Sequence, residues 1–382
     1  MSSNITDKAL NIPSFIVMDV LERARVLEGQ GIDIIHMEVG EPDFDTPDCI
    51  VQAGCQALKE GKTHYTHSQG LLLLREAICE DYHKRYGVSF DPDQVIVTMG
   101  TSPALLMLFA AMLDKDDEII MTNPYYPCYA NMVKFLGGVP RLVPVTPEES
   151  FHLTPEKIKP FLSRKTKAIL INSPANPTGM CMDPEVMEEI VGIGVPIISD
   201  EIYHGIRYEG KDHSFLEFQQ EAFVINGFSK RYAMTGWRLG YLVVPKNWIR
   251  PLQKMQQNFF ISASDFAQWA GLAALREAQP DVDRMVQTYR ERRDYLYTAL
   301  NNLGFKIYDL PQGAFYLFAD CREFSENAYT FAFDILEHAH VGITPGIDFG
   351  PMGEGYVRFS YANSLENIKE GVKRIREYLK NS

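Results

Sequence analysis

The chain has 382 residues, is 46% hydrophobic and carries a formal net charge of -13 at pH 7. This length suffices for a large core in two or more domains, and the negative charge disfavours binding to nucleic acid or to an anionic membrane. No apolar run approaches the roughly 20 residues of a membrane span, and the polar start MSSNITDKALNIP lacks a signal-peptide core. The 6 cysteines form no C-x-x-C pair, so we expect free thiols in a cytoplasmic protein, without a zinc site or a disulfide framework.

Short β-branched runs alternate with helical patterns along most of the chain, which predicts a mainly parallel sheet covered by helices. After a first helix at Val17–Glu28, the predicted strands are Gln94–Thr98, Glu118–Thr122, Ala168–Ile171, Pro196–Ser199, Phe223–Asn226 and Arg238–Val244. The predicted helices are Leu71–Arg85, Ala104–Leu113, Pro184–Ile193, Ala267–Ala278 and Val282–Leu303.

The pattern changes beyond about residue 285, where the sequence predicts a smaller α+β domain. Its strands are Ala314–Phe318 and Tyr356–Phe359, and its helices are Phe331–His338 and Leu365–Leu379. We therefore expect a large domain at 46–285 and a small domain made of 1–45 and 286–382. The N-terminal segment is assigned to the small domain because its helix precedes the main sheet pattern.

The first candidate site is the turn between the strand ending at Thr98 and the next helix. Gly100 lets the backbone approach a ligand closely, Thr101 follows it, and Ser102 is typical of a helix N-cap. The N–H groups at such a helix start attract anions, so this turn can hold a phosphate. The alternative is an ordinary capped helix that binds nothing.

Two further candidates follow predicted strands. Tyr126 comes after the strand Glu118–Thr122 and can stack on a flat ring, or can pack in the core. Asn176 lies in a loop with two prolines, and either Ser173-Pro174 or Asn176-Pro177 is a candidate cis bond. Asn176 is then a rigidly held donor, and the alternative is a plain turn.

Asp200 ends a buried apolar run, Val195–Ile198. A buried, unpaired carboxylate costs several kcal/mol, so Asp200 needs a cationic partner, and a pyridinium nitrogen is suitable. The alternative is an N-cap for the next helix. Tyr203, three residues later, can reach a phenolic oxygen on the same ring.

Lys230 follows the apolar run Phe223–Ile225 within Gly227-Phe228-Ser229-Lys230. A strand fixes its backbone, its amine can point into a crevice, and Ser229 and Arg238 can share an anion beside it. A pyridoxal phosphate enzyme needs this combination of an amine for a Schiff base and groups that hold a phosphate. The alternative for a lone lysine is a solvated position after a strand.

Arg358 lies inside the apolar strand Tyr356–Phe359. Its buried guanidinium requires an anionic partner, which can be the α-carboxylate of an amino acid or an internal salt bridge. Four earlier candidates follow predicted strands: Ser102, Tyr126, Asn176 and Asp200. Ligands bind at that edge of open α/β sheets.

In this order the motifs closely resemble those of class I/II aminotransferases of pyridoxal-phosphate fold type I, and the chain is similar to the bacterial aspartate aminotransferase-like subgroup. The resemblance covers nearly the whole chain, with motifs at Gly40–Phe44, His64–Thr66, Gly70, Leu74–Glu76, Asn176–Gly179, Asp200–Tyr203, Ser229-Lys230, Met234–Arg238, Gly313–Tyr316 and Arg358. It implies an α/β fold: a large domain with a mainly parallel seven-stranded sheet flanked by helices, plus a smaller α+β domain.

The resemblance also implies roles around pyridoxal 5'-phosphate. Lys230 is the Schiff-base lysine and proton carrier, Asp200 pairs with the pyridinium, and Tyr203 and Asn176 bond the ring hydroxyl. The remaining implied contacts are Gly100, Thr101, Ser102, Ser229 and Arg238 to the phosphate, Tyr126 on the ring, Arg358, Asn176 and Gly40 to the substrate carboxylate, and Tyr65 to the phosphate of the neighbouring subunit. The implied assembly is a homodimer with shared active sites.

The chain departs from this family in several places. Ala175 stands where many relatives have asparagine. Relatives that act on aspartate use an extra basic group for the distal carboxylate, and none can be assigned here. Phe259 and Phe260, before Ser262–Ser264, are apolar for a pocket wall. The segment near Phe15–Val17 either lines the substrate pocket, as it usually does in relatives, or simply packs.

The resemblance predicts a pyridoxal-phosphate-dependent aminotransferase that moves an amino group between an L-amino acid and a 2-oxo acid, with aspartate, alanine, aromatic and branched-chain donors all open. The alternatives are a pyridoxal-phosphate-dependent C–S β-lyase, similar to cystathionine β-lyase, and a non-catalytic ligand-binding relative.

Overall fold

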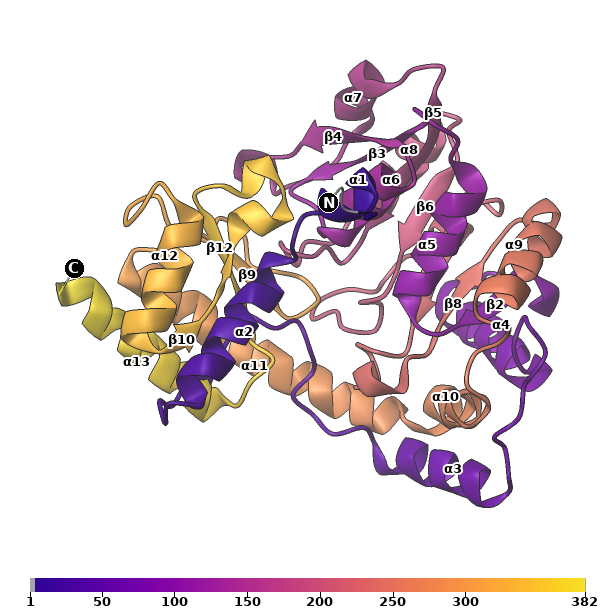
Figure 1. The fold of residues 1–382 in the computed structure, drawn as a ribbon, viewed down its shortest axis with the longest axis horizontal. Helices are drawn as coiled ribbons and strands as arrows, with labels where there is room; N and C mark the ends of the chain where they lie inside the picture. Colours follow the sequence, from indigo (N-terminus) through magenta and orange to yellow (C-terminus); the bar gives the residue numbers. More distant parts are fainter. Residues whose placement is uncertain (1–3, 382) are drawn as a thin grey trace.

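A computed structural model describes residues 4–381. A seven-stranded sheet flanked by helices forms the larger part, and a small antiparallel sheet lies beside it (Figure 1). The large sheet has the order β2-β8-β7-β6-β5-β3-β4, and only the pairs that include β8 are antiparallel. Its strands are β2 (Val95–Thr98), β3 (Glu118–Asn123), β4 (Val139–Pro144), β5 (Thr166–Asn172), β6 (Ile197–Asp200), β7 (Phe223–Gly227) and β8 (Gly240–Val243). The predicted fold class is confirmed.

The strand β4 is absent from the strands predicted by sequence. Pro140 and Pro144 lie within it, and Val143 is its only buried residue, so it lacks the apolar pattern of a central strand. It forms the edge of the sheet, where a strand tolerates proline because one side needs no partner.

Successive strand residues face opposite sides of the large sheet. The helices around this sheet are α3 (Asp48–Lys59), α4 (Leu72–Tyr86), α5 (Thr101–Met112), α6 (Cys128–Phe135), α7 (Pro155–Ile158), α8 (Pro184–Val191), α9 (Lys246–Phe259) and α10 (Asp265–Glu277). Ile96 packs in one apolar cluster with α5, α6 and α9, whereas Val95 and Val97 pack in another with α4 and α10. The sheet is therefore buried on both faces, and its carboxyl edge remains open to ligands.

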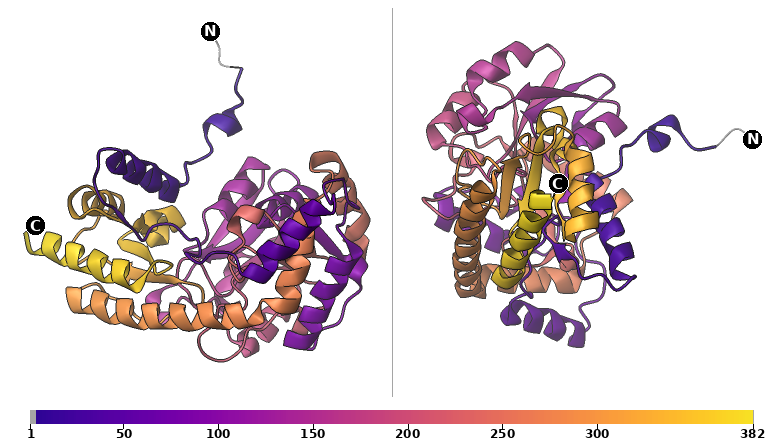
Figure 2. Two further views of the ribbon diagram at one scale, coloured as in Figure 1. Left: turned by 90° about the horizontal axis from the view of Figure 1, so that it is seen from below. Right: turned by 90° about the vertical axis from the view of Figure 1, so that its left-hand side faces the viewer.

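The second part of the molecule combines both ends of the chain. The sheet β11-β12-β9 is antiparallel, and β1 pairs in parallel with β10. Its elements are α1 (Asp7–Leu10), α2 (Ile16–Glu28), β1 (Ile35–His36), β9 (Tyr316–Asp320), α12 (Ala328–Asp334), β10 (Val341–Gly342), β11 (Thr344–Pro345), β12 (Tyr356–Ser360) and α13 (Leu365–Asn381). The long helix α11 (Gln279–Leu303) runs between the two parts (Figure 1), and the segment that carries α1 projects from the body (Figure 2).

Within residues 4–381, none of the helices combines the length and apolarity needed to cross a bilayer. The same residues contain no cluster of His, Cys, Asp and Glu that could hold a metal ion. All six cysteines lie in this range and are free thiols.

Candidate active site

A cleft opens at the carboxyl edge of the large sheet. Most of the site residues predicted from the sequence line it: Gly40, Thr101, Ser102, Tyr126, Asn176, Asp200, Tyr203, Ser229, Lys230, Arg238 and Arg358. Gly100 is not among the lining residues but directly precedes Thr101, which is, and Tyr65 does not line this cleft. Residues that are up to 318 positions apart in sequence therefore meet in one place.

Lys230 lies three residues beyond the end of β7 and enters the cleft. Its Nζ donates to the backbone oxygen of Gly40 at 2.6 Å. Burial is the main cause that lowers the pKa of the Lys230 ammonium to about 8, while Glu41 raises this pKa and the cations Arg358 and Arg238 lower it. An amine with such a pKa is partly neutral near neutral pH and can act as a nucleophile or a base.

Asp200 ends β6 and is buried beneath the cleft. Its Oδ2 accepts the hydroxyl of Tyr129 at 2.5 Å, and its Oδ1 accepts the backbone N–H of Ile202 at 3.1 Å. Burial raises the pKa of the Asp200 carboxyl to about 6, against the lowering effect of these two hydrogen bonds. A turn follows Asp200, so it caps no helix, and neither of these donors is cationic.

Tyr129 is a site residue that was not predicted from the sequence. It lies in the first turn of α6, three residues after Tyr126, and the rings of the two tyrosines meet edge to face at 5.3 Å. The run Tyr125-Tyr126-Pro127-Cys128-Tyr129 contains the signal, because proline favours a helix start and the helix then returns Tyr129 to the same side.

The loop after β5 connects Asp200 to Asn176. Both Ser173-Pro174 and Asn176-Pro177 are cis, where the sequence left the choice open. Asn172 donates from Nδ2 to the carbonyl of Asp200 at 3.0 Å and accepts from the N–H of Asn176 at 2.9 Å. The side-chain oxygen of Asn176 accepts from Arg358 Nη1 at 3.0 Å. The loop therefore fixes Asn176 between the carboxylate and the arginine.

Arg358 lies on β12 and is 2% exposed. Its guanidinium donates to Asn176, to the backbone oxygen of Glu38 and to the hydroxyl of Thr344, none of which is charged. Its Nε is buried and has no hydrogen-bond partner among the described residues. The guanidinium also lies 4.4 Å from the ring centroid of Tyr316. These partners leave the arginine without the internal carboxylate that a structural salt bridge would supply.

Gly100 and Arg238 meet at the amino end of α5. The helix begins at Thr101, so Gly100 is its N-cap and Ser102 lies in the first turn, which corrects the predicted cap. Gly100 has φ +95°, and a Cβ there would lie 2.5 Å from Arg238 Nη2. Only glycine fits this close approach.

The predicted strand Arg238–Val244 begins too early, because Arg238 follows a 3-10 turn, has φ +52° and precedes β8. Since β8 is antiparallel to its neighbours, its amino end lies at the carboxyl edge of the other strands. This reversal brings Arg238 beside Thr101 and Ser229 in the cleft.

The predicted tyrosines occupy different positions. The hydroxyl of Tyr203 is 2.8 Å from that of Tyr316, and both residues are buried at the cleft. Tyr126 lines the cleft and packs edge-on against Phe15 at 5.8 Å. Tyr65 is 80% exposed and does not line the cleft of its own chain.

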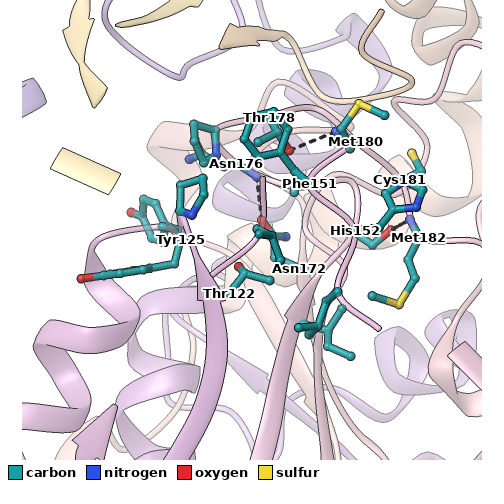
Figure 3. A pocket seen from close by; sticks show the side chains of 18 of the residues that line it. Thr122, Tyr125, Phe151, His152, Asn172, Asn176, Thr178, Met180, Cys181 and Met182 are labelled. Carbon is teal, nitrogen blue, oxygen red and sulfur yellow. Dashed lines mark hydrogen bonds between the residues drawn. The ribbon is translucent and has the colours of Figure 1, made fainter. Parts of the chain in front are cut away.

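A second, smaller cavity lies beside the Asn172–Asn176 loop. Figure 3 shows it between Tyr125, Phe151 and Met182. Its lining includes neither an acidic side chain nor a lysine or arginine, and the polar loop groups bond to one another, as Thr178 Oγ1 does with the N–H of Met180 at 3.3 Å. The charged groups gather instead in the cleft of Lys230.

Residues 32–375 match the family model described as aminotransferase class I and II. The chain is 44% identical over 379 residues to a (5-formylfuran-3-yl)methyl phosphate transaminase of Methanocaldococcus jannaschii, covering 98% of this chain and 99% of the relative. It is 39% identical over 365 residues to the aspartate/prephenate aminotransferase of Thermus thermophilus, covering 94% of each.

A solved structure from Methanococcus jannaschii, described as similar in its active site to kynurenine aminotransferases, superimposes with a TM-score of 0.91. It is 44% identical and covers 98% of this chain and 100% of its own.

Proposed function

This chain belongs to the class I and II aminotransferase family and transfers amino groups, and we propose that it does so with pyridoxal 5'-phosphate held on Lys230. The observation that supports this most is the convergence of Lys230, Asp200, Arg238 and Arg358 on one cleft. The amine of Lys230 matches the aldehyde of the cofactor, and the carboxylate of Asp200 matches its ring nitrogen. The guanidinium groups of Arg238 and Arg358 match the phosphate and the substrate carboxylate.

The residues present fit this cofactor. Asp200 is a buried carboxylate whose partners are a hydroxyl and an N–H, so a cationic ring nitrogen would relieve the cost of its burial. Gly100 leaves space that a Cβ would fill against Arg238, and the first turn of α5 offers N–H groups to a phosphate. Tyr126, Tyr203, Thr101, Ser102 and Ser229 complete the proposed contacts.

When bound, the cofactor supplies an electron sink for the charge that develops at the substrate α-carbon. Lys230 would hold the cofactor, give way to the amine of the substrate, and then take the proton from the α-carbon of the donor. In the second half of the reaction it would give a proton to the α-carbon of the new amino acid. Its lowered pKa suits this work, because a fraction of the amine is neutral near neutral pH. The charge of Asp200 would keep the ring nitrogen protonated, and Tyr203 would hold the ring hydroxyl.

Arg358 would bind the α-carboxylate of the substrate. Its fork has a buried Nε without a partner, and Asn176 holds the guanidinium from one side. A carboxylate that accepts from this fork would be fixed with its α-carbon toward Lys230, together with the backbone of Gly40.

We also propose a homodimer with shared active sites, in which Tyr65 reaches the phosphate of the neighbouring copy. Tyr65 is 80% exposed, and Thr66 joins its segment to Ser262 through an N–H to Oγ bond of 3.3 Å. Phe259 and Ile261, just before Ser262, are 61% and 46% exposed. Exposed apolar side chains of this kind are typical of a surface that another protein covers.

The division into a domain at 46–285 and a second domain made of 1–45 and 286–382 remains part of the proposal. The pairing of β1 with β10 supports it, because it joins the two ends of the chain. A cytoplasmic location is proposed from the composition, and the free thiols are compatible with it.

Nothing in the comparisons favours the C–S lyase alternative or a non-catalytic relative, since the curated relatives reported above are named as a transaminase and an aminotransferase. Their names differ in substrate, so the donor and acceptor of this chain stay open at this level. The similarity to kynurenine aminotransferases, given for the solved structure, supports an aromatic-type donor.

The test of this function is a Lys230→Ala variant supplied with pyridoxal 5'-phosphate. We expect the variant to bind the cofactor and to show no transamination, because one substitution removes both the attachment point and the base. Near-normal turnover would refute the assignment.

A further inference from the structure

The first turn of α2 closes one side of the cleft with apolar side chains. Phe15, Val17 and Met18 all line it, and the ring of Phe15 packs edge-on against Tyr126 at 5.8 Å. Val17 is 5% exposed, whereas Met18 is 43% exposed and reaches the open side. A substrate side chain that points away from Lys230 toward this turn meets hydrocarbon.

Each positive charge of the cleft already has a proposed partner. Its lining contains three cationic side chains, Lys230, Arg238 and Arg358, which the proposed function assigns to the cofactor, its phosphate and the substrate α-carboxylate. Glu41 also lines the cleft. A second carboxylate on the substrate would find no free cation among these lining residues and would be repelled by Glu41.

The apolar wall is fixed in place by Asp348. Its Oδ1 accepts the N–H of Ile16 at 3.0 Å and its Oδ2 accepts the N–H of Val17 at 3.3 Å. The first N–H groups of a helix lack partners within the helix, and α2 has no capping side chain at its own N-cap, Phe15. Asp348 therefore positions the turn that carries Phe15, Val17 and Met18.

The surface near Tyr65 is also apolar. The segment that contains Tyr65 bonds to Ser262 through Thr66, and the exposed side chains just before Ser262 are Phe259 and Ile261. If Tyr65 reaches the cleft of a second copy, this apolar surface approaches that cleft as well.

On these observations we propose that the side-chain subsite of this cleft selects amino acids with uncharged, apolar side chains, aromatic ones included, and rejects dicarboxylic acids. The first turn of α2 is the selecting wall. This inference rests on the proposed function, since it takes Arg358 as the partner of the α-carboxylate.

The test compares two ligand pairs on the cofactor-loaded protein. The first pair is unreactive: calorimetry should show that 3-phenylpropionate binds at least about tenfold more tightly than succinate. Each acid can place one carboxylate on Arg358, and the two then differ in having a phenyl group or a second carboxylate at the side-chain subsite. The second comparison uses reactive amino acids and follows the loss of absorbance of the lysine-bound cofactor. The kcat/KM values for L-phenylalanine and L-leucine should be at least about tenfold above those for L-aspartate and L-glutamate.

A matched pair of variants tests the wall itself. Met18→Arg places a cation at the open side of the cleft, and should raise the ratio of kcat/KM for L-aspartate over L-phenylalanine at least about tenfold. Val26→Arg adds the same charge to the same helix at an exposed residue outside the cleft lining, and should leave the ratio unchanged.

Tighter binding of succinate, or faster reaction of the dicarboxylic donors in the natural protein, would overturn the selection. An equal response to Met18→Arg and Val26→Arg would remove the turn from its role as the wall. If no amino acid discharges the cofactor, the proposed function fails, and the binding of the two unreactive acids still decides this inference separately.

Discussion

The hydroxyl of Tyr129 donates to the carboxylate of Asp200 at 2.5 Å, between two side chains that are both buried. This hydrogen bond stabilises the charged form of a carboxyl whose pKa burial raises to about 6. The carboxylate must be charged to attract a protonated ring nitrogen. Tyr129 therefore supports cofactor binding from behind Asp200.

Substitution Tyr129→Phe removes the donor and keeps the ring. The affinity of the cofactor-free protein for pyridoxal 5'-phosphate should fall as the pH drops toward about 6, and the variant should show this fall at a pH about 1 unit higher or more. Absorbance titrations at several pH values measure both curves.

The cofactor phosphate also titrates in this range, but it contributes equally to both proteins, so the difference between the curves isolates Asp200. A variant curve that coincides with that of the natural protein would show that Tyr129 only packs.

Substitution Asp200→Asn should make the cofactor-free protein more stable at pH 7.5. The same substitution should abolish the activity of the cofactor-loaded enzyme. The folded pKa is raised from the ordinary 3.8 to about 6, so the folded protein retains a proton that the unfolded chain has released. This contribution to stability is fully present below pH 3.8 and is lost as the pH rises through about 6.

At pH 7.5 the buried charge then costs up to about 3 kcal/mol, which the amide avoids. Denaturant unfolding should show the gain at pH 7.5 and little difference near pH 4. A variant that is less stable than the natural protein at pH 7.5 would contradict the electrostatic account of this site.

Substitution Arg358→Lys keeps the positive charge and removes the paired N–H donors of the guanidinium. We expect kcat/KM for amino acid donors to fall at least tenfold, mainly through KM, since the carboxylate contact is the same in the bound substrate and in the transition state. Steady-state kinetics measure this split. Arg374→Lys, on α13, is the control, because Arg374 pairs with Asp33 at the surface, and unchanged kinetics in Arg358→Lys would remove the proposed role.

A mixture of two inactive variants tests the shared active sites. Lys230→Ala and Tyr65→Ala should each lose most activity, but a hybrid dimer would contain one site with both defects and one site with neither. Refolding the two together should therefore restore about a quarter of the natural activity if subunits pair at random. Activity no greater than that of the separate variants would contradict a phosphate contact from the partner.

Much of this site could be predicted from the sequence because most of its residues follow strands. Asp200 and Asn176 come after short apolar runs, and parallel strands bring their carboxyl ends to one edge. Arg238 is the instructive exception. It was assigned to a strand, and it reaches the site only because β8 runs in the opposite direction, which strand patterns in one sequence do not reveal.

The contacts that the sequence did not predict depend on side-chain packing across distant segments. Tyr129 meets Asp200 across 71 positions, and Asp348 meets Ile16 across 332. Edge strand β4 was missed for a different reason, since its prolines and single buried residue lack the local pattern of a central strand. Sequence periodicity reports burial along one element, and these features arise between elements.

The attachment of the cofactor to Lys230 is the central claim, and borohydride reduction followed by peptide mass spectrometry tests it most directly. The purified protein would be incubated with pyridoxal 5'-phosphate, reduced and digested. We predict that the reduced cofactor is found on the peptide that contains Lys230, and that it is absent from this site in Lys230→Ala. An unmodified Lys230 peptide, or stable labelling of another lysine in its place, would contradict the account.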